Sequence, residues 1–204
     1  MKTKSTYFTP DFRMFFEDLK VNNNKEWFKR NKHRYDNHVA QPFNVFIDQI
    51  LRTIQKQDNS INITVDEAVF RIHRDLRFTK DKSPYKIFKS ALISPKGRKS
   101  KEVPGLYLEM GEDHIKVAGG CFKLNSRQIS KLEDNYEPIE LITNKPEFIS
   151  CWGELIKNKY SLTYQTQLPS NLLTSNILDL KIQAYWQKLK PVIDNFKEIL
   201  QSDI

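Results

Sequence analysis

The sequence predicts an α+β fold, a single domain in which a mostly antiparallel sheet of about four strands is flanked by N-terminal and C-terminal helices. Three observations lead to this prediction. Apolar residues recur every three or four positions in the first quarter and the last third of the chain, as in amphipathic helices. In the middle, apolar and polar residues alternate in short runs, as in half-buried strands. A length of 204 residues fits one domain, 1–204, and no linker or repeat divides it.

The first quarter of the chain predicts two long helices. Residues 11–20 place four apolar side chains on one face, and residues 28–54 carry a longer apolar stripe. Between them Asn23 is the expected N-cap, with Glu26 three positions later in the arrangement of a capping box. Pro42 interrupts the second stripe, so we expect it to kink or divide that helix.

The middle of the chain predicts the strands of the sheet. Residues 68–78 alternate as a half-buried strand, but Arg74 occupies an apolar position, which indicates a bulge, a turn or an inward-pointing cation. Further strands are expected at residues 87–94, 106–110 and 115–118, and a hairpin loop joins the first two of these.

The last third of the chain predicts helices again. Ser126 is the expected N-cap of a helix over residues 127–142, and a second helix is expected over residues 147–157. An irregular segment then leads into a final apolar stripe over residues 178–199, which Pro191 crosses.

The net charge of +8 is concentrated in one segment of the chain. Residues 71–101 contain eleven Lys and Arg against two Asp, whereas all other residues together hold 22 basic and 23 acidic side chains. An excess that is confined to 31 residues predicts a local electropositive surface rather than a diffusely basic protein.

Several functional classes lack the residues that they require. No apolar core of a secretory signal and no run of about 18 apolar residues occurs, so we expect no membrane span and a cytoplasmic location. Two cysteines are too few for a disulfide framework, which fits a reducing compartment. The histidines show no metal-binding spacing, and no Gly-rich phosphate loop is present, so no metal or cofactor is expected. The HRDL sequence at residues 73–76 lacks the accompanying protein-kinase motifs.

The basic segment predicts a pocket for a small anionic ligand, most plausibly a phosphorylated or nucleotide-like molecule. Arginine forks and lysine ammonium groups are the side chains that bind phosphate, and two local carboxylates are too few to neutralise them. The expected ligand-binding residues are Arg71, Arg74, Arg77, Lys82 and Lys86. The pattern fits both a binding protein and an enzyme. In the enzyme, Asp75 or Asp81 would be the base of a hydrolytic or transfer reaction and Tyr85 an orienting donor.

Two alternatives compete with this hypothesis. The first is a nucleic-acid-binding protein without catalytic activity, which would use the hairpin cations Lys96, Arg98, Lys99 and Lys101. The second is a scaffold, in which carboxylates of the first helices neutralise the basic segment and form a structural ion-pair network.

The central motif resembles a known family. The pattern R-x-x-R-D-x-R-F-x-x-D-K-x-P-Y-K, from Arg71 to Lys86, and the upstream N-N-N-K-E-W-F are similar to those of the conserved hypothetical family called domain of unknown function 2461. The resemblance covers residues 8–142, and the helices expected over residues 143–204 are diverged. The resemblance implies a single-domain cytoplasmic protein of mixed α and β structure. It does not indicate which activity, if any, the protein has. A basic L-K-x-x-P-K-G segment typical of the family is missing before the last helix.

Overall fold

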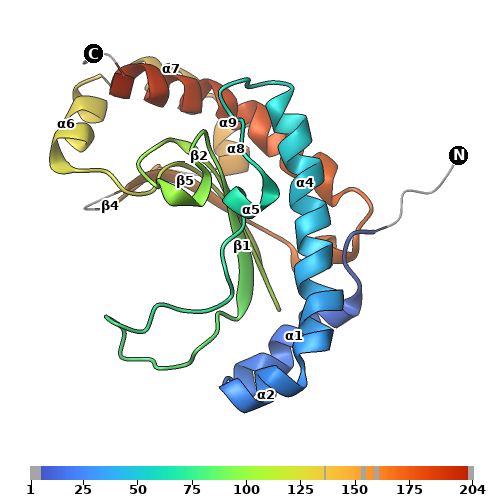
Figure 1. Cartoon of the computed structure of the whole chain (residues 1–204). Coiled ribbons are helices and arrows are strands. Elements are labelled where there is room, and N and C mark those ends of the chain that lie inside the picture. The colour runs from blue at the N-terminus through green and yellow to red at the C-terminus, as the bar shows by residue number, and fades with distance from the viewer. Residues whose placement is uncertain (1–5, 136, 153–154, 159–160, 202–204) are drawn as a thin grey trace, which may run out of the picture.

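The computed structural model describes residues 6–135, 137–152, 155–158 and 161–201 and has the predicted α+β architecture. One five-stranded antiparallel sheet packs against helices from both ends of the chain, and together they form a single domain (Figure 1). The predicted fold class is therefore confirmed, although the number of strands is five rather than about four. Among the described helices, none is both long enough and apolar enough to cross a membrane.

The helices lie mainly before and after the sheet in the chain. The helical elements are α1 (Pro10–Val21), α2 (Lys25–Arg30), α3 (Lys32–Arg34), the π-helix η1 (Tyr35–Ala40), α4 (Gln41–Gln55), α5 (Val65–Ala68), the 3₁₀ turn η2 (Gly97–Lys99), α6 (Ser126–Asp134), α7 (Glu137–Thr143), α8 (Pro146–Trp152), the 3₁₀ turn η3 (Ser170–Thr174) and α9 (Leu178–Gln201). The strands are β1 (Phe88–Ile93), β2 (Gly105–Gly111), β3 (Ile115–Cys121), β4 (Leu155–Asn158) and β5 (Ser161–Leu168).

The strand order in the sheet is β1-β2-β3-β5-β4, and every neighbouring pair is antiparallel. One row of directly paired residues crosses four strands in the order Leu92, Tyr107, Ala118 and Gln165. Because successive side chains of a strand point to opposite faces, this row lies on one face of the sheet. The neighbouring positions of β2, such as Leu106 and Leu108, are fully buried in the core on the other face.

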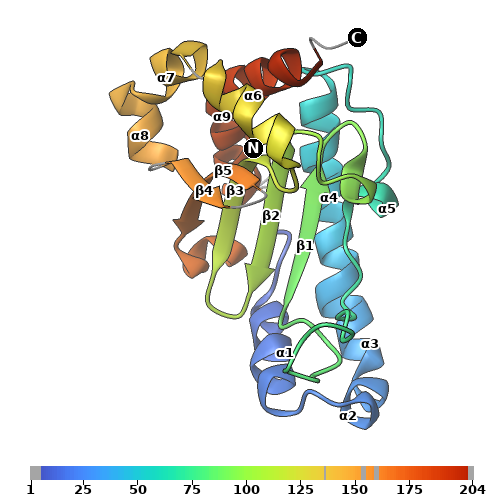
Figure 2. The same ribbon diagram turned by 90° about the vertical axis from the view of Figure 1, so that its left-hand side faces the viewer.

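Helices cover the apolar face of the sheet and leave the opposite face open. α4 contacts β1, α9 contacts β3 and α8 contacts β5. α9 approaches β3 so closely that a Cβ atom on Gly119 would lie 1.9 Å from Cδ2 of the buried Leu189. Figure 2 looks onto the opposite face, where β1 and β2 are seen with no helix in front of them.

The N-terminal helices differ in detail from the sequence prediction. Asn24, not Asn23, caps α2 and accepts a hydrogen bond from the backbone N–H of Trp27 (2.9 Å). Pro42 lies in the first turn of α4, where the π-helix gives way to an α-helix, so the long apolar stripe is divided close to the proline as predicted. The π-helical turn η1 precedes it, so the backbone changes its winding just before the proline.

The prediction of a strand over residues 68–78 is wrong. Ala68 ends the short helix α5, and the chain then makes only two isolated bridges, Val69 to Ala91 and His73 to Tyr85. Two strands were missed instead. The helix expected over residues 147–157 is present as α8, but β4 occupies its predicted end, and β5 lies in the segment that we expected to be irregular.

The helix expected over residues 127–142 is divided into α6 and α7. Asn125, rather than Ser126, is its N-cap and forms a capping box with Gln128. The final helix α9 extends through Pro191 as one element.

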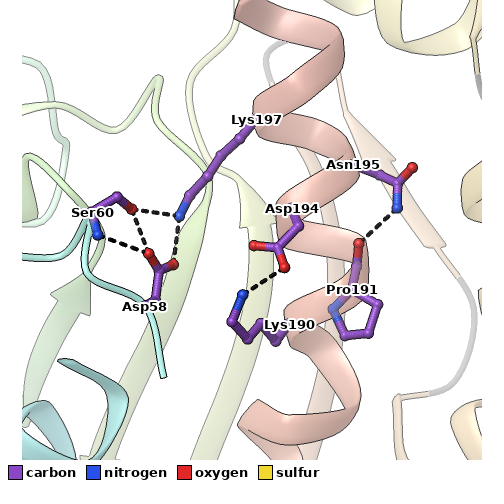
Figure 3. A network of polar contacts seen from close by, with 7 residues as sticks. All are labelled: Asp58, Ser60, Lys190, Pro191, Asp194, Asn195 and Lys197. Atoms are coloured by element: carbon purple, nitrogen blue, oxygen red, sulfur yellow. Dashed lines mark hydrogen bonds and ion pairs between the residues drawn. The ribbon is translucent and has the colours of Figure 1, made fainter. Parts of the chain in front are cut away.

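A buried ion pair joins the loop after α4 to α9 (Figure 3). The ammonium group of Lys197 donates to Asp58 Oδ2 (2.6 Å) and to the hydroxyl of Ser60 (2.9 Å). Burial alone would raise the pKa of Asp58, but the hydrogen bonds from Lys197 and Ser60 outweigh it and lower that pKa. One turn away on α9, Lys190 pairs with Asp194 at 2.6 Å.

We expect Lys197→Met to lower the free energy of unfolding by roughly 3 kcal/mol, because it leaves the Asp58 carboxylate buried without a cation. The double variant Asp58→Asn/Lys197→Met removes both charges and should recover most of this loss. The difference in free energy of unfolding between the parent and Lys197→Met should shrink as the pH falls below 3.8, because acid protonates Asp58 in both proteins. Urea unfolding measures these effects, and a double variant as unstable as Lys197→Met would contradict the interpretation.

Candidate functional site

The basic motif forms a long loop, residues 70–86, that is anchored at its base (Figure 1). The Phe70 N–H donates to the Ser90 carbonyl (2.9 Å), and the Lys86 N–H donates to the Ile72 carbonyl (2.8 Å). The Arg74 N–H donates to the Pro84 carbonyl (2.9 Å). The two arms of the loop are therefore held together, and residues 75–83 form its tip.

Charges within the tip pair with one another. Arg74 forms an ion pair with Asp81, and Arg77 donates to both carboxylate oxygens of Asp75. The ammonium group of Lys82 donates to the Leu76 carbonyl (3.0 Å). The hydrogen bond from Arg77 lowers the pKa of Asp75 to about 2, and the hydrogen bond from Arg74 also lowers the pKa of Asp81. Both carboxyl groups are consequently weak proton acceptors.

An asparagine from the N-terminal helices clamps the loop. The side chain of Asn23 donates to the Tyr85 carbonyl (2.9 Å) and accepts from the Tyr85 N–H (3.1 Å). The Tyr85 ring is buried and stacks on Phe28, with 4.0 Å between ring centroids. The residue that the sequence predicted as a helix cap therefore satisfies both backbone groups of a motif residue.

A pocket of about 290 Å³ lies on the open face of the sheet. Its floor comes from the strands, and its walls come from the motif loop, the β1–β2 connection and the end of β3. The lining residues are Phe70, Lys86, Ser90, Leu92, Lys101, Tyr107, Lys116, Ala118, Phe122 and Gln165. This volume is at the small end of pockets for small molecules, which measure about 300–1,000 Å³.

Lysine side chains dominate the electrostatics of this pocket. The ammonium groups of Lys86 and Lys101 lie 5.2 Å and 5.5 Å from the centroid of the Phe70 ring. Neither has a carboxylate within 4.0 Å among the residues that the structure describes. Burial lowers the pKa of Lys86, and the nearby charges of Lys101 and Arg71 lower it further, while Glu109 acts in the opposite direction. Positive charge therefore accumulates at one end of the pocket.

A chain of hydrogen bonds fixes the tyrosine on the pocket floor. The Tyr107 hydroxyl donates to Glu109 Oε2 (2.6 Å), and His114 Nε2 lies 3.1 Å from Glu109 Oε1. The hydrogen bond that Glu109 accepts from His114 raises the pKa of His114, although burial opposes this. Burial and the Glu109 charge raise the pKa of Tyr107, so its hydroxyl stays protonated. Tyr107 thus lines the pocket with its hydroxyl held by Glu109.

A lysine lies beneath this site, on the core face of the sheet. Lys89 is only 4% exposed, and its ammonium group donates to the Phe70 carbonyl (3.1 Å). The rings of Phe43 and Tyr35 lie 5.6 Å and 6.0 Å from that group. Burial, followed by the charges of Lys86 and Arg98, lowers the pKa of Lys89 to about 8.

The structure separates the candidate residues of the sequence into two places. Arg74, Asp75, Asp81, Tyr85 and Lys86 line a second pocket of about 490 Å³ at the base of the tip, where the arginine and both carboxylates are already engaged in ion pairs. Arg71, Arg77 and Lys82 line neither pocket. Lys86 lines both.

The four hairpin cations are exposed but make different contacts. Arg98 donates to the Val69 carbonyl (3.0 Å), and Lys99 pairs with Glu67 at 3.2 Å. Lys101 lines the sheet-face pocket, and Lys96 does not. Within the described part of the chain, no three His, Cys, Asp or Glu side chains gather in a geometry that could hold a metal ion.

Sequence reasoning missed the residues that the strands contribute. Lys116, Tyr107 and Gln165 were not candidates, although the alternation of β2 and β3 would have placed the first two on one face. No local pattern connects Gln165 with the basic segment, because β5 pairs with β3 only in the folded sheet.

Comparison with known proteins supplies the family. A family model described as a conserved hypothetical protein (DUF2461) matches residues 11–191. The chain belongs to the DUF2461 family. Neither a curated protein nor a solved structure matches this chain. The DUF2461 match extends past the range 8–142 of the expected resemblance and includes β5 and most of α9.

The clamp predicts a local effect of Asn23→Ala. Loss of two hydrogen bonds to a partly buried backbone should lower the free energy of unfolding by about 1–2 kcal/mol and loosen the loop. Limited trypsin digestion should then cut faster after Arg77, Lys80 and Lys82. Asn24→Ala, which removes a helix cap of similar strength, serves as the matched control. Equal cleavage rates in the two variants would contradict a clamp at Asn23.

Lys89 predicts a pH-dependent stability. Its pKa is about 8 in the folded protein and 10.5 without the fold, so the unfolded state binds more protons between these values. The parent should therefore gain stability relative to Lys89→Met as the pH rises from 7 to 9.5. Urea midpoints of both proteins at the two pH values measure this gain. Parallel pH dependences would mean that Lys89 is solvated in the folded state.

Proposed function

We propose that this protein binds a phosphorylated small molecule in the pocket on the open face of the sheet. The observation that carries the proposal is the pair of lysines, Lys86 and Lys101, whose ammonium groups both lie near the Phe70 ring and have no carboxylate partner among the described residues. Two like charges held in a partly buried pocket repel each other, and a bound anion relieves this repulsion.

The surroundings of the two lysines favour an anion over solvent alone. Phe70 and Phe122 reduce the water around the pocket, so an ion pair there is stronger than one on an open surface. Lys116 adds a third ammonium group. It lies directly across the β2–β3 pair from Glu109, whose negative charge partly compensates the charge of the lysine. The excess charge at the Phe70 end is thus close to two, which matches a phosphate monoester dianion.

The proposal keeps one part of the sequence hypothesis and changes another. Lys86 remains a binding residue, and Arg71 adds to its positive potential. Arg74, Arg77 and Lys82 instead hold the loop tip together. The proposal concerns binding and assigns no base, because Asp75 and Asp81 are engaged by arginines and the Tyr85 ring is stacked on Phe28.

Phosphate should raise the melting temperature of the parent protein relative to chloride at matched ionic strength. A ligand at 100 times its Kd stabilises the folded state by about 2.7 kcal/mol. The double variant Lys86→Met/Lys101→Met should fold and lose this gain. Lys25→Met, at an exposed position on α2, is the matched control and should keep it.

Two outcomes would contradict the proposal. One is a parent protein whose melting temperature is the same in phosphate as in chloride at matched ionic strength. The other is a phosphate gain that is as large in Lys86→Met/Lys101→Met as in the Lys25→Met control.

A further inference from the structure

We infer that the ligand is a nucleoside monophosphate that lies across the strands, with its phosphate at Lys86 and Lys101 and its base at Gln165. This inference rests on the proposed binding of a phosphorylated molecule and names the rest of that molecule. Four features of the pocket lead to it: its length, its flat apolar middle, the amide at its far end and its charge.

The pocket is longer than a phosphate ion. Its floor includes Leu92, Ala118 and Gln165, which belong to β1, β3 and β5. Three spacings of about 4.8 Å separate β1 from β5, so the floor is about 14 Å wide. The two unpartnered lysines come from connections at the β1 and β2 end of this row, and Gln165 lies on β5, the strand of this row farthest from them. A phosphate ion alone would fill only the cationic end.

The middle of the pocket is apolar and suits a flat ring. Leu92 and the small Ala118 form the floor on either side of Tyr107, and both are almost fully buried. The Phe122 ring lies 5.8 Å from the Tyr107 ring at an angle of 50°. Rings at this distance contact each other directly. A planar base can therefore stack on a face of the Phe122 ring, because every base has a π-face that stacks on aromatic side chains.

The far end of the pocket offers one oriented hydrogen-bond acceptor. Gln165 Nε2 donates to the hydroxyl of the buried Thr163 (3.0 Å), and this bond orients the amide. Gln165 Oε1 has no partner among the described residues, so it is free to accept from a ligand. An acceptor in this position can accept a hydrogen bond from the amino group of adenine. It would repel a carbonyl oxygen at the same ring position, because neither oxygen can donate.

The charge of the pocket fits one phosphate group. Lys86 and Lys101 are unpartnered, whereas Glu109 faces Lys116 across the β2–β3 pair. A monophosphate carries a charge near −2 at neutral pH, which these two ammonium groups balance. A triphosphate would bring more negative charge than the described cations of the pocket can compensate.

Calorimetric titration with four ligands tests the inference: inorganic phosphate, ribose 5-phosphate, adenosine 5′-monophosphate and inosine 5′-monophosphate. Adenosine monophosphate should bind at least about tenfold more tightly than ribose 5-phosphate, because only the nucleotide stacks on the rings. It should also bind more tightly than inosine monophosphate, which has an oxygen in place of the amino group.

Substitutions assign these differences to residues. Gln165→Leu should abolish the preference for adenosine over inosine monophosphate and leave the affinity for ribose 5-phosphate unchanged. Gln167→Leu, an exposed position of the same strand outside the pocket, is the matched control. Phe122→Leu should weaken the binding of both nucleotides and leave the binding of ribose 5-phosphate unchanged. This variant tests the stacking independently if Gln165→Leu fails to fold.

The outcomes separate this inference from the proposed function. Equal affinity for ribose 5-phosphate and both nucleotides would overturn the inference and leave phosphate binding intact. A preference for adenosine monophosphate that survives Gln165→Leu would overturn the role of Gln165. Failure of all four ligands to bind would overturn the proposed function and the inference together.

Discussion

Helices cover only one face of the sheet, and the rest of the structure depends on this constraint. Side chains of a strand alternate between the two faces of the sheet. Each apolar residue that β2 or β3 directs into the core therefore leaves its neighbour on the other face. The covered face needs close packing, as the contact of Leu189 with Gly119 demonstrates. The other face is free to carry Tyr107, Glu109 and Lys116, and the motif loop with its phenylalanine and lysine forms a wall beside them.

The sequence predicts those elements of the fold whose pattern is decided locally. β1, β2 and β3 match their predicted positions, since each has a clear run of strand residues between turn residues. The segment at residues 68–78 has the alternation of a strand but no neighbour along most of its length, so the pattern reflects two bridges and a loop. β5 shows the same alternation, with Leu162, Tyr164 and Leu168 buried, but its polar residues resemble a loop.

The candidate site follows the same division between local and distant contacts. The pairs Arg77–Asp75 and Arg74–Asp81 join residues two and seven positions apart, so the sequence contains the information that these charges cancel. The meeting of Lys86 with Lys101 depends on how the β1–β2 connection folds over the sheet, and the sequence hypotheses assigned these two lysines to different ligands. Gln165 of β5 enters the pocket only through the pairing of β5 with β3, for which no local pattern exists.

The order of the strands also bears on how the chain folds during synthesis. β1, β2 and β3 form a meander with short connections, so they can pair soon after they leave the ribosome. β5 pairs with β3 only after α6, α7, α8 and β4 have been made, and closing this long loop carries a larger entropic cost. The nascent domain therefore assembles the lysine-rich end of its pocket early, and until β5 arrives the free edge of β3 is open to pairing with another chain.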